Sequence, residues 1–569
     1  MTERFDVAIV GAGHNGLVAA NYLARAGLSV LVLEAREVVG GACVTEALFP
    51  DHPETRWSSC AFVQGLFRDE IVRELELARF GLSMYAPDVQ GFSLFEDGSH
   101  LFLWAELDRT LREIERYSRK DAEAFLLFGS RFRRFGEILF PFMAMPPVPR
   151  SEVFKAFEAA GEEALLDEFL LGSARDLLDR YFESPHVKGF LCFFGMVSIW
   201  GSPSTPGTSY VYGHHASGSF EGHLSRWAFV RGGMGGITRA LADAARAHGA
   251  TIRTDAPVGR VIVRGGRARG VALQSGEEID AGIVVSNADP KRSLLGLVEP
   301  GVLDTGFRDA VAAIDQRGSM ARVHLLVDAL PDYRGLPPGA GPQHRGHQML
   351  GASLEAFERA FEAQRAGVIP DNMQIEAIIQ SVTDPSLAPE GLHTLTLGVQ
   401  HVPAELASGT WDDAKEAWAD KVVDTLCRYA PNMRDHIVAR RVITPLDLER
   451  DYNLTGGNIF HAAMTLPQLF GARPLPALAS YRTPVGGYYL CGAGMHPGGG
   501  VMGLPGRNAA TVILADLKGE TARRTAAAPA HRGLVDRALE TALGRKLGRA
   551  LARNAALRPL TERAARSRK

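Results

Sequence analysis

The sequence predicts an α/β fold, and three stretches carry this prediction. Near the N-terminus the chain reads strand, glycine-rich turn, helix and second strand. Residues 231–289 supply another glycine-rich turn, a helix and further strands. Residues 488–517 repeat the order of strand, glycine-rich turn and helix. This alternation is typical of a parallel or mixed sheet with helices on its faces.

The first stretch has the spacing of a dinucleotide-binding unit. Residues 5–10 (FDVAIV) form a compact apolar strand, and residues 11–16 (GAGHNG) follow it directly. Residues 17–26 have helical spacing, and residues 28–33 (LSVLVL) form a second strand. A GxGxxG match is weak alone, but this strand–turn–helix–strand context makes it a Rossmann-like signature.

Each position in that signature has a physical reason. Gly11 allows the tight turn, Gly13 lets the backbone approach a pyrophosphate, and Gly16 allows the helix to pack closely on the strand. The helix N-terminus around Asn15 offers unpaired N–H groups to phosphate. Glu34 lies eighteen residues beyond Gly16, where it can accept hydrogen bonds from ribose hydroxyls and would repel a 2′-phosphate.

The other two stretches bring further parts of the same domain. Residues 231–236 (RGGMGG) open a helix that runs to Ala250, a strand pair follows at 251–263, and 283–289 (IVVSNAD) comes next. Residues 488–491 (YYLC) form a short strand before the loop 492–503, which leads into a helix at 508–517. A glycine-rich loop between strand and helix is again an anion- or dipole-binding device.

These motifs closely resemble those of phytoene-desaturase-like FAD flavoproteins. The likeness is nearest to the branch named pyridine nucleotide-disulfide oxidoreductase domain-containing protein. It includes the pair Gly40-Gly41, the segment 458–469 (NIFHAAMTLPQL) and residues 481–484 (YRTP), and it covers roughly residues 5–520.

The resemblance implies FAD as the cofactor. In such flavoproteins the glycine pair after the ribose-binding acid lets the backbone pass beside the extended FAD, whereas nicotinamide dehydrogenases need no such pair. It also implies that the Val258 backbone meets the adenine, and that N–H groups near Val501 and Met502 face the flavin carbonyl at C2. Many relatives carry Arg where this chain has Ala42, so that cationic contact is missing or supplied elsewhere. The predicted cofactor-binding residues are Gly11, Gly13, Asn15, Gly16, Glu34, Ala35, Arg36, Gly41, Ala42, Val258, Gly492, Gly494, Val501 and Met502.

The five cysteines argue against the disulfide chemistry in the name of that branch. A disulfide reductase needs a close redox-active pair. None of these cysteines forms a CxxC pair, and sixteen residues separate Cys43 from Cys60. No metal site is indicated, and a reducing compartment is expected.

Three residues are the predicted catalytic candidates. His496 is the ionisable group inside the loop 492–503, the closing loop, although it could equally hold that loop in place before Pro497. His461 belongs to a segment that lines the substrate side in relatives, with packing as the alternative. Arg482 could clamp an anionic substrate group or pair with an acidic neighbour.

The domain organisation follows from these placements. Residues 1–60, 226–295 and 480–520 are predicted to form the FAD-binding domain, and residues 61–225 and 296–479 an α+β substrate domain built from insertions. Within the latter, residues 190–200 (FLCFFGMVSIW) read as buried core or an apolar substrate wall. Residues 140–149 (FPFMAMPPVP) read as a connector or a lid, and 210–215 (YVYGHH) as a core or cavity cluster.

The charge is asymmetric. The whole chain has a net charge of −3, but Arg523 to Lys569 hold thirteen basic and three acidic residues, a net of +10. The tail 521–569 is therefore a basic, partly amphipathic appendage, able to lie on an anionic membrane or to pack on the acidic body. It lacks interleaved aromatics, so nucleic acid is not expected. No signal peptide or spanning segment is recognised, and a cytoplasmic protein, peripheral to a membrane at most, is expected.

The function predicted from the resemblance is an FAD-dependent oxidoreductase. Its substrate would be apolar, unsaturated and lipid- or isoprenoid-like, changed at carbon–carbon bonds by desaturation, saturation or isomerisation. An FAD-dependent amine or alcohol oxidase is the first alternative. A weakly catalytic flavin-binding protein that acts through partners or a membrane is the second. The substrate, the electron acceptor and the oligomeric state are not predicted.

Overall fold

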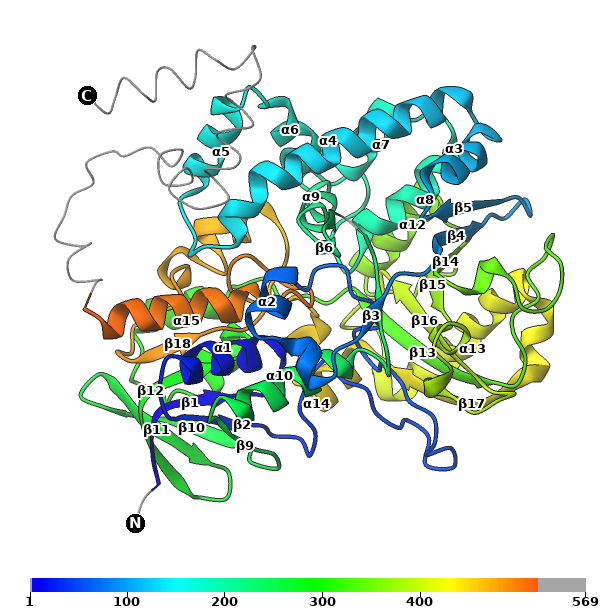
Figure 1. Cartoon of the computed structure of the whole chain (residues 1–569). Helices are drawn as coiled ribbons and strands as arrows, with labels where there is room; N and C mark the ends of the chain where they lie inside the picture. Colours follow the sequence, from blue (N-terminus) through cyan, green and yellow to red (C-terminus); the bar gives the residue numbers. More distant parts are fainter. Residues whose placement is uncertain (1–2, 225, 520–569) are drawn as a thin grey trace. The chain divides into compact units, whose positions relative to one another are not determined.

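The computed structural model describes residues 3–224 and 226–519. The predicted basic tail, residues 521–569, lies outside them. The described strands form two seven-stranded sheets and two small two-stranded ones (Figure 1). The small sheets pair β3 (Met84–Tyr85) with β8 (Phe229–Val230), and β6 (Ser219–Phe220) with β7 (His223–Leu224).

The first large sheet has the order β10-β11-β12-β1-β2-β9, with β18 also paired to β12. β1 pairs in parallel with β2 and β12, β2 with β9, and β12 with β18, whereas β10, β11 and β12 are antiparallel. The sheet is therefore mixed with a parallel centre, which confirms the predicted α/β fold class. Its strands are β1 (Arg4–Val10), β2 (Val30–Leu33), β9 (Thr251–Arg253), β10 (Val258–Arg264), β11 (Arg267–Leu273), β12 (Glu278–Ser286) and β18 (Tyr488–Leu490).

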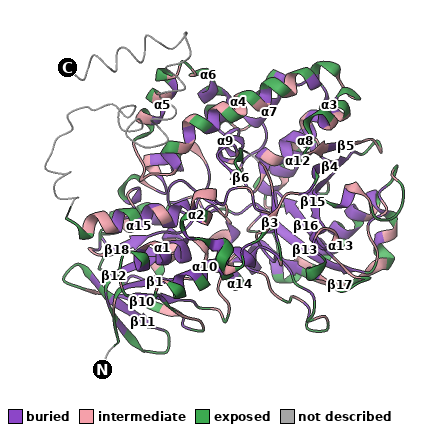
Figure 2. Cartoon of the chain, viewed as in Figure 1, coloured by how far each residue is buried: buried purple, intermediate pink, exposed green. Residues whose placement is uncertain are grey.

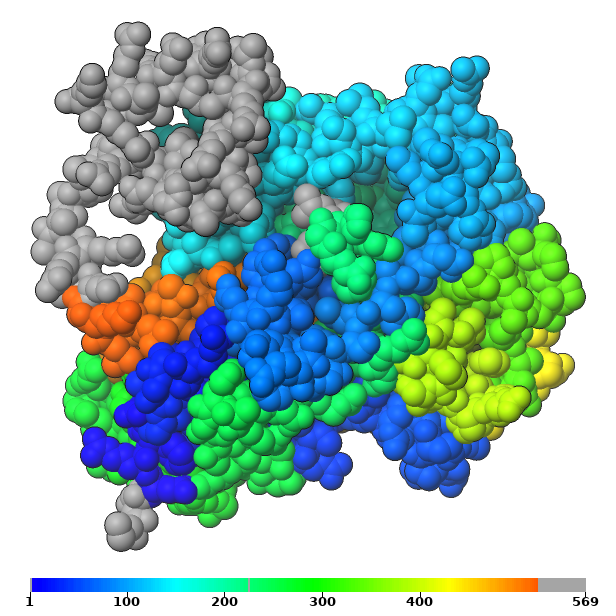
Figure 3. All heavy atoms as spheres, viewed as in Figure 1, coloured from blue at the N-terminus to red at the C-terminus, as the bar shows by residue number. Residues whose placement is uncertain are grey.

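Two helices cover this sheet together. α1 (His14–Arg25) starts directly after the glycine turn, and α10 (Gly235–Ala247) comes from the middle of the chain. Asn21 of α1 is buried and its amide donates to the Leu241 carbonyl of α10 at 2.8 Å. Figure 3 shows the blue N-terminal residues beside the green residues of this middle segment. Segments more than two hundred residues apart in sequence thus build one dinucleotide-type unit.

The second large sheet has the order β17-β13-β16-β15-β14-β4-β5. All its pairings are antiparallel except that of β14 with β4. The second large sheet is therefore also mixed, with one parallel pairing. Its strands are β4 (Val89–Leu94), β5 (His100–Trp104), β13 (Met320–Val327), β14 (His347–Leu350), β15 (Gln374–Ile378), β16 (His393–Gln400) and β17 (Ile437–Ile443).

Alternation gives the second sheet two different buried faces. On β13, Ala321, Val323 and Leu325 belong to the core that packs against α13 (Trp411–Tyr429). The intervening side chains, among them Arg322, point to the opposite face because strand side chains alternate. Both faces are buried, and β13 is drawn as buried along its length in Figure 2.

Along the chain, most of the remaining helices lie between a strand of one large sheet and a strand of the other. Helix α4 (Arg119–Met143) is capped at its start by Ser118, whose side chain accepts from the Asp121 N–H at 3.1 Å. The others are α2 (Asp69–Glu74), α3 (Leu107–Glu115), α5 (Arg150–Ala159), α6 (Ala164–Leu166), α7 (Ala174–Tyr181), α8 (Pro185–Met196), α9 (Tyr210–Ala216), α11 (Thr305–Ala312), α12 (Leu354–Arg365), α14 (Pro445–Tyr452) and α15 (Leu504–Leu517).

The predicted loop 140–149 is only partly a loop. Residues 140–143 are the last turn of α4, and Phe142 and Met143 are buried. The Asn508 amide donates to the carbonyls of Met143 and Met145, at 3.0 and 3.2 Å. The segment thus connects α4 to α5 and packs against the chain around Asn508. Among residues 3–224 and 226–519, no helix combines the length and apolarity needed to cross a membrane.

Candidate cofactor and substrate site

A single cavity of about 470 Å³ runs from the N-terminal glycine turn to the second large sheet. Its size falls within the range of about 300–1,000 Å³ found for small-molecule sites. The residues that line it include eleven of the predicted cofactor and catalytic residues. These are Gly11, Gly13, Asn15, Glu34, Ala35, Arg36, Gly41, Ala42, Val258, His461 and Val501.

The two N-terminal glycine segments pack directly on each other. Gly13 and Gly40 form a parallel bridge, and the Gly40 N–H donates to the Ala12 carbonyl at 3.0 Å. A Cβ on Gly13 would lie 2.6 Å from Nδ2 of Asn287, and one on Gly40 would lie 2.6 Å from the Cys43 carbonyl oxygen. Gly41 has a positive φ of 55°, which favours glycine. The glycine pair is therefore needed for the approach of protein backbone to protein backbone as well as for a bare cavity wall.

Glu34 ties the turn to the end of β2. Its carboxylate accepts from the Ala12 N–H at 2.7 Å and from the Arg36 N–H at 3.0 Å. The side chain is buried, yet it lines the cavity. The remaining acceptor positions of this carboxylate are available to a ligand in the cavity, as ribose recognition requires.

Buried polar atoms without hydrogen-bond partners mark the same region as a dinucleotide site. Among the described residues, Asn15 Oδ1, Arg36 Nη1 and His14 Nε2 are such atoms, and all three residues line the cavity. Buried polar groups are normally satisfied, so orphans along one cavity indicate a polar ligand. Together with the glycine cradle and the N-terminus of α1, they fit the phosphates and sugars of FAD.

Arg36 is held in place by a network that spans distant segments. Its Nη2 donates to Glu46 at 2.5 Å, and the Tyr452 hydroxyl donates to the same carboxylate at 2.7 Å. The guanidinium carbon lies 4.8 Å from the Tyr452 ring centroid. These contacts fix the guanidinium at the cavity, where its Nη1 has no partner among the described residues.

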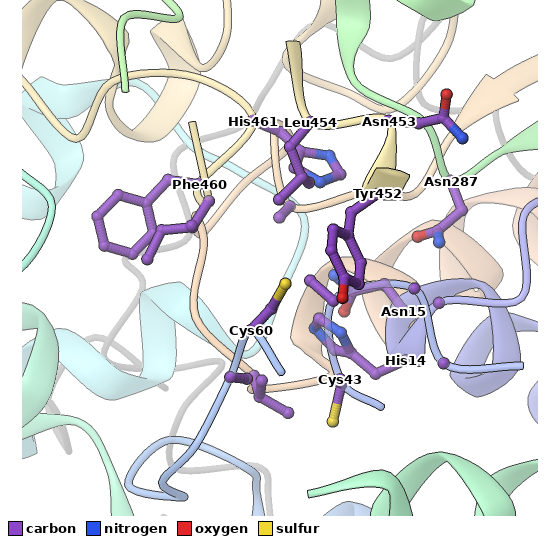
Figure 4. Close-up of a pocket in the computed structure, with 18 of the residues that line it drawn as sticks. His14, Asn15, Cys43, Cys60, Asn287, Tyr452, Asn453, Leu454, Phe460 and His461 are labelled. Atoms are coloured by element: carbon purple, nitrogen blue, oxygen red, sulfur yellow. The ribbon is translucent and has the colours of Figure 1, made fainter. Parts of the chain in front are cut away.

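Two half-buried histidines, His14 and His461, line the cavity, and Figure 4 shows them gathered with Tyr452. Burial and the neighbouring His461 lower the pKa of His14 to about 4. Burial also lowers the pKa of His461, whose Nδ1 has no hydrogen-bond partner among the described residues. Both rings are therefore neutral near pH 7.

The other two predicted catalytic residues are not among the described residues that line the cavity. His496 is buried, and its Nε2 hydrogen-bonds the Phe142 carbonyl at 2.7 Å. That contact fits the loop-holding role left open by the sequence. Arg482 is half-buried and forms a β-bridge with Tyr489. The structure thus brings only His461 of the three to the cavity.

Four predicted cofactor-binding residues are not among the described residues that line the cavity: Gly16, Gly492, Gly494 and Met502. A Cβ on Gly16 would lie 2.3 Å from the Gly11 carbonyl oxygen, which gives the expected reason for that glycine. A Cβ on Gly492 would lie 2.5 Å from the Asn287 carbonyl oxygen, and one on Gly494 would lie 2.7 Å from the Pro290 ring. Met502 is buried beside Val501.

Arg473, which sequence reasoning did not single out, braces the cofactor end of the cavity. Its fully buried guanidinium donates to six carbonyls, and burial lowers its pKa to about 10. The acceptors belong to two segments that meet only in the fold. They are Phe460, Ala462, Ala463 and Gln468 in one segment, and Ala493 and Met495 in the closing loop.

Beyond the cofactor region the cavity continues into a chamber, whose walls include apolar and aromatic side chains. Phe193, Phe194 and Val197 come from the predicted apolar stretch 190–200, which therefore includes both core and cavity wall. Of the cluster 210–215, His215 lines the chamber, and burial lowers its pKa to about 4. The Tyr212 hydroxyl instead donates to a backbone carbonyl of α8.

The chamber also holds polar residues that sequence reasoning missed. Arg322 on β13 and the hydrogen-bonded pair His347–Glu376 line it. The His347 ring lies 5.2 Å from that of Trp227, and its Nε2 has no partner among the described residues. The sequence did contain a signal for Arg322. In a strand over residues 320–327, Arg322 lies on the opposite face from the apolar Ala321 and Val323. Membership of one cavity was not visible in the sequence.

The cysteines give no redox pair. Cys43 and Cys60 both line the cavity, but Figure 4 shows their sulfur atoms pointing away from each other. Burial raises the pKa of both thiols to about 12. Thiols held protonated in this way are poor nucleophiles.

Comparisons with known proteins agree with this geometry. Residues 9–62 match the NAD(P)-binding Rossmann-like domain family, and residues 95–514 match the family described as flavin containing amine oxidoreductase. The mouse pyridine nucleotide-disulfide oxidoreductase domain-containing protein 2 is 38% identical over 91% of this chain and 94% of its own. The lycopene-forming phytoene desaturase of a Paracoccus strain is 25% identical over 90% of this chain and 97% of its own.

Solved structures show the same fold. Putrescine oxidase with bound putrescine superposes with a TM-score of 0.59, at 16% identity, over 91% of this chain and 100% of its own. The long match to one family and the extended similarity to the mouse protein confirm the resemblance found in the sequence. The chain belongs to the flavin containing amine oxidoreductase family, and its cofactor is FAD.

Proposed function

We propose that this oxidoreductase acts at carbon–carbon bonds of an apolar, unsaturated lipid- or isoprenoid-like substrate. One observation carries the proposal: the dinucleotide groove and the apolar chamber form one continuous cavity. A relative 25% identical to this chain is a phytoene desaturase, whose name describes such chemistry. When bound, FAD supplies a hydride acceptor or donor at its isoalloxazine ring.

The protein orients the substrate, excludes water from the chamber and accepts a proton. Phe193, Phe194 and Trp227 exclude water from the chamber and hold an apolar body by contact. Forming a double bond removes a proton as well as a hydride, so a proton acceptor is needed. His461 and His347 are the candidates, because each lines the cavity with one ring nitrogen unpartnered among the described residues.

His347 is the better oriented of the two. Glu376 accepts from its Nδ1–H, which fixes the tautomer and leaves Nε2 as the acceptor. His347→Gln is expected to slow flavin reduction by substrate about 10²- to 10⁴-fold while FAD binding stays unchanged. If His461→Gln slows flavin reduction by this factor and His347→Gln does not, His461 is the proton acceptor instead.

An amine or alcohol oxidase is the second candidate, and aromatic rings favour it. Phe193, Phe194 and Trp227 lie together in the chamber with the Glu376 carboxylate, a combination that can hold a cation. However, the Glu376 carboxylate already bonds His347, and the Arg322 guanidinium lines the same chamber. A cationic amine would be repelled by Arg322, so the apolar substrate fits the chamber better. The cavity also reaches the cofactor region, which disfavours a flavin sealed from substrate.

Anaerobic visible spectroscopy of the purified holoenzyme tests the proposal. The flavin bands are expected at about 375 and 450 nm. Bleaching by phytoene would identify a desaturase, and bleaching by NADH or NADPH a saturase or a reduced-flavin isomerase. Bleaching by putrescine would support the amine oxidase instead. Bands that persist with all of these compounds would support the weakly catalytic alternative.

A further inference from the structure

Arg322 has an environment that no packing role explains. It lies on β13, lines the chamber and is 2% exposed. Among the described residues, its Nε and Nη1 have no hydrogen-bond partner. Its Nη2 meets only the Met320 sulfur at 3.3 Å, and its guanidinium carbon lies 5.0 Å from the Phe62 ring centroid. A buried guanidinium with donors left over is costly unless a ligand supplies acceptors.

The register of the sheet places Arg322 and Glu376 on one face, with Gly398 between them. Arg322 lies directly opposite Gly398 on β16, and Gly398 lies directly opposite Glu376 on β15. Residues opposite one another across strands point to the same face. Arg322 and Glu376 are therefore about two strand spacings, or roughly 10 Å, apart. Met320 and Phe62, which also line the cavity, pack over Gly398, where a Cβ would lie 3.4 Å from the Met320 methyl carbon and 3.5 Å from the Phe62 ring.

Glu376 does not pair with Arg322 across that distance. No ion pair joins the two among the described residues, and the Glu376 carboxylate bonds His347. The sulfur of Met320 and the ring of Phe62 are weak acceptors compared with a carboxylate. Arg322 is therefore a buried cation whose strongest possible partner is missing from the protein itself.

We propose that Arg322 binds a carboxylate on the substrate. The substrate is then an apolar molecule with one acidic end, whose body lies against the aromatic walls around Phe193 and Trp227. A guanidinium is weakly hydrated and its planar donors match carboxylate oxygens, so this pairing is strong in a dry cavity. This inference rests on the proposed function, because it names a feature of the substrate of the same site.

The test uses three ligands that share one chain and differ in their head group. Decanoate, decanol and decylamine are titrated into the anaerobic holoenzyme, and binding is read from the change in the flavin spectrum. The wild-type protein should bind decanoate at least tenfold more tightly than decanol, and decylamine most weakly. Equal affinities for decanoate and decanol in the wild-type protein would overturn the proposal.

The variants Arg322→Met and Arg322→Lys locate the effect. The methionine variant keeps an unbranched buried side chain, and it should lose decanoate affinity about 10- to 100-fold while decanol affinity stays unchanged. The lysine variant keeps the charge and should retain part of the preference. Arg345→Met, which removes an exposed ion pair with Asp88, is the matched control and should behave as wild type.

Two further outcomes separate this proposal from its alternatives. If Arg322→Met loses FAD rather than decanoate affinity, Arg322 serves the cofactor and the carboxylate site is wrong. If decanoate binds through Arg322 but neither unsaturated hydrocarbons nor unsaturated fatty or isoprenoid carboxylates change the flavin spectrum, the carboxylate site stands and the proposed carbon–carbon chemistry fails. A folded control for each variant is its flavin content after purification.

Discussion

At the residue scale, the site depends on polar groups that are buried and kept neutral or unpaired. His324 illustrates the neutral kind, although it lies outside the cavity. It is fully buried on β13, with Nδ1 3.0 Å from the Thr396 hydroxyl and Nε2 3.1 Å from the Ser59 carbonyl oxygen. Burial lowers its pKa to about 3. The ring donates from one nitrogen and accepts at the other, so the neutral form is the one that the fold stabilises.

This arrangement predicts a pH-dependent stability. The pKa of His324 is lower in the folded protein than the ordinary 6.5, so below pH 6.5 the unfolded state binds the proton first. Its contribution is then lost as pH falls from about 6.5 toward 3, by up to about 1.4 kcal/mol for each pH unit. His324→Gln should flatten the fall in Tm between pH 6.5 and 5, measured with excess FAD. His223→Gln, at an exposed position, should not; parallel curves for wild type and His324→Gln would contradict the argument.

At the element scale, glycines decide how closely segments approach, and their roles differ by place. Gly16 lies at the start of α1, where a Cβ would meet the Gly11 carbonyl oxygen at 2.3 Å. Gly129 lies inside α4, where a Cβ would meet no atom within 4 Å. The same substitution should therefore have opposite effects at the two positions.

Gly16→Ala is expected to lower both Tm and flavin content. The added methyl group would overpack the turn and force its backbone to move, which costs about 1–3 kcal/mol of folding stability. Gly129→Ala should keep the flavin and raise stability by about 0.5–1 kcal/mol, since alanine favours the helix. Thermal unfolding and the ratio of flavin to protein absorbance measure both. A Gly16→Ala protein with full flavin content and unchanged Tm would show that the close packing is not needed.

Another element-scale feature is the brace made by Arg473. Replacing it by Met leaves six buried carbonyls without their donor. Each buried unsatisfied group costs about 1–3 kcal/mol, so several kcal/mol of stability should be lost even after partial relaxation. Arg450→Met, which removes an ion pair that is more than half exposed on its Arg side, should change stability by less than about 0.5 kcal/mol.

Chemical denaturation followed by flavin release and tryptophan fluorescence compares these two variants. Flavin should leave the Arg473→Met protein at a lower denaturant concentration than global unfolding requires, because the brace joins the segment around residue 460 to the closing loop. Simultaneous loss of both signals at the wild-type midpoint would rule the brace out.

At the scale of the whole molecule, the charge is divided along the sequence. Residues 523–569 have a net charge of +10, and the rest of the chain has −13. We propose that the tail binds anionic membrane surfaces. The full chain should then co-sediment with phosphatidylglycerol vesicles at low salt and be released at high salt, since exposed charges are screened.

A chain ending at residue 519 provides the comparison. It should lose vesicle binding and keep its flavin, because the residues that line the cavity all precede this point. Phosphatidylcholine vesicles should bind neither protein. Equal binding of both chains to anionic vesicles would place the contact elsewhere.

The sequence by itself determined the dinucleotide unit. Gly11, Gly13, Gly16 and Glu34 act within a short stretch, and local backbone geometry fixes what each must do, so spacing alone predicts their places. The helices and strands around these residues could be predicted for the same reason, because each depends on the local spacing of apolar residues. Boundaries moved by a few residues, as where α1 begins at His14 instead of Leu17, because capping and packing decide the ends.

The tertiary structure alone decided the chamber. Arg322, His347 and Glu376 come from three strands, and nothing in their local sequence says that the sheet aligns them on one cavity wall. His496 and His461 look alike in sequence, yet one bonds a carbonyl of α4 and the other lines the cavity. Sequence patterns report which face of an element is apolar, whereas the partner of a polar side chain depends on contacts between segments hundreds of residues apart. The cofactor could therefore be predicted from local motifs, and the features that select the substrate could not.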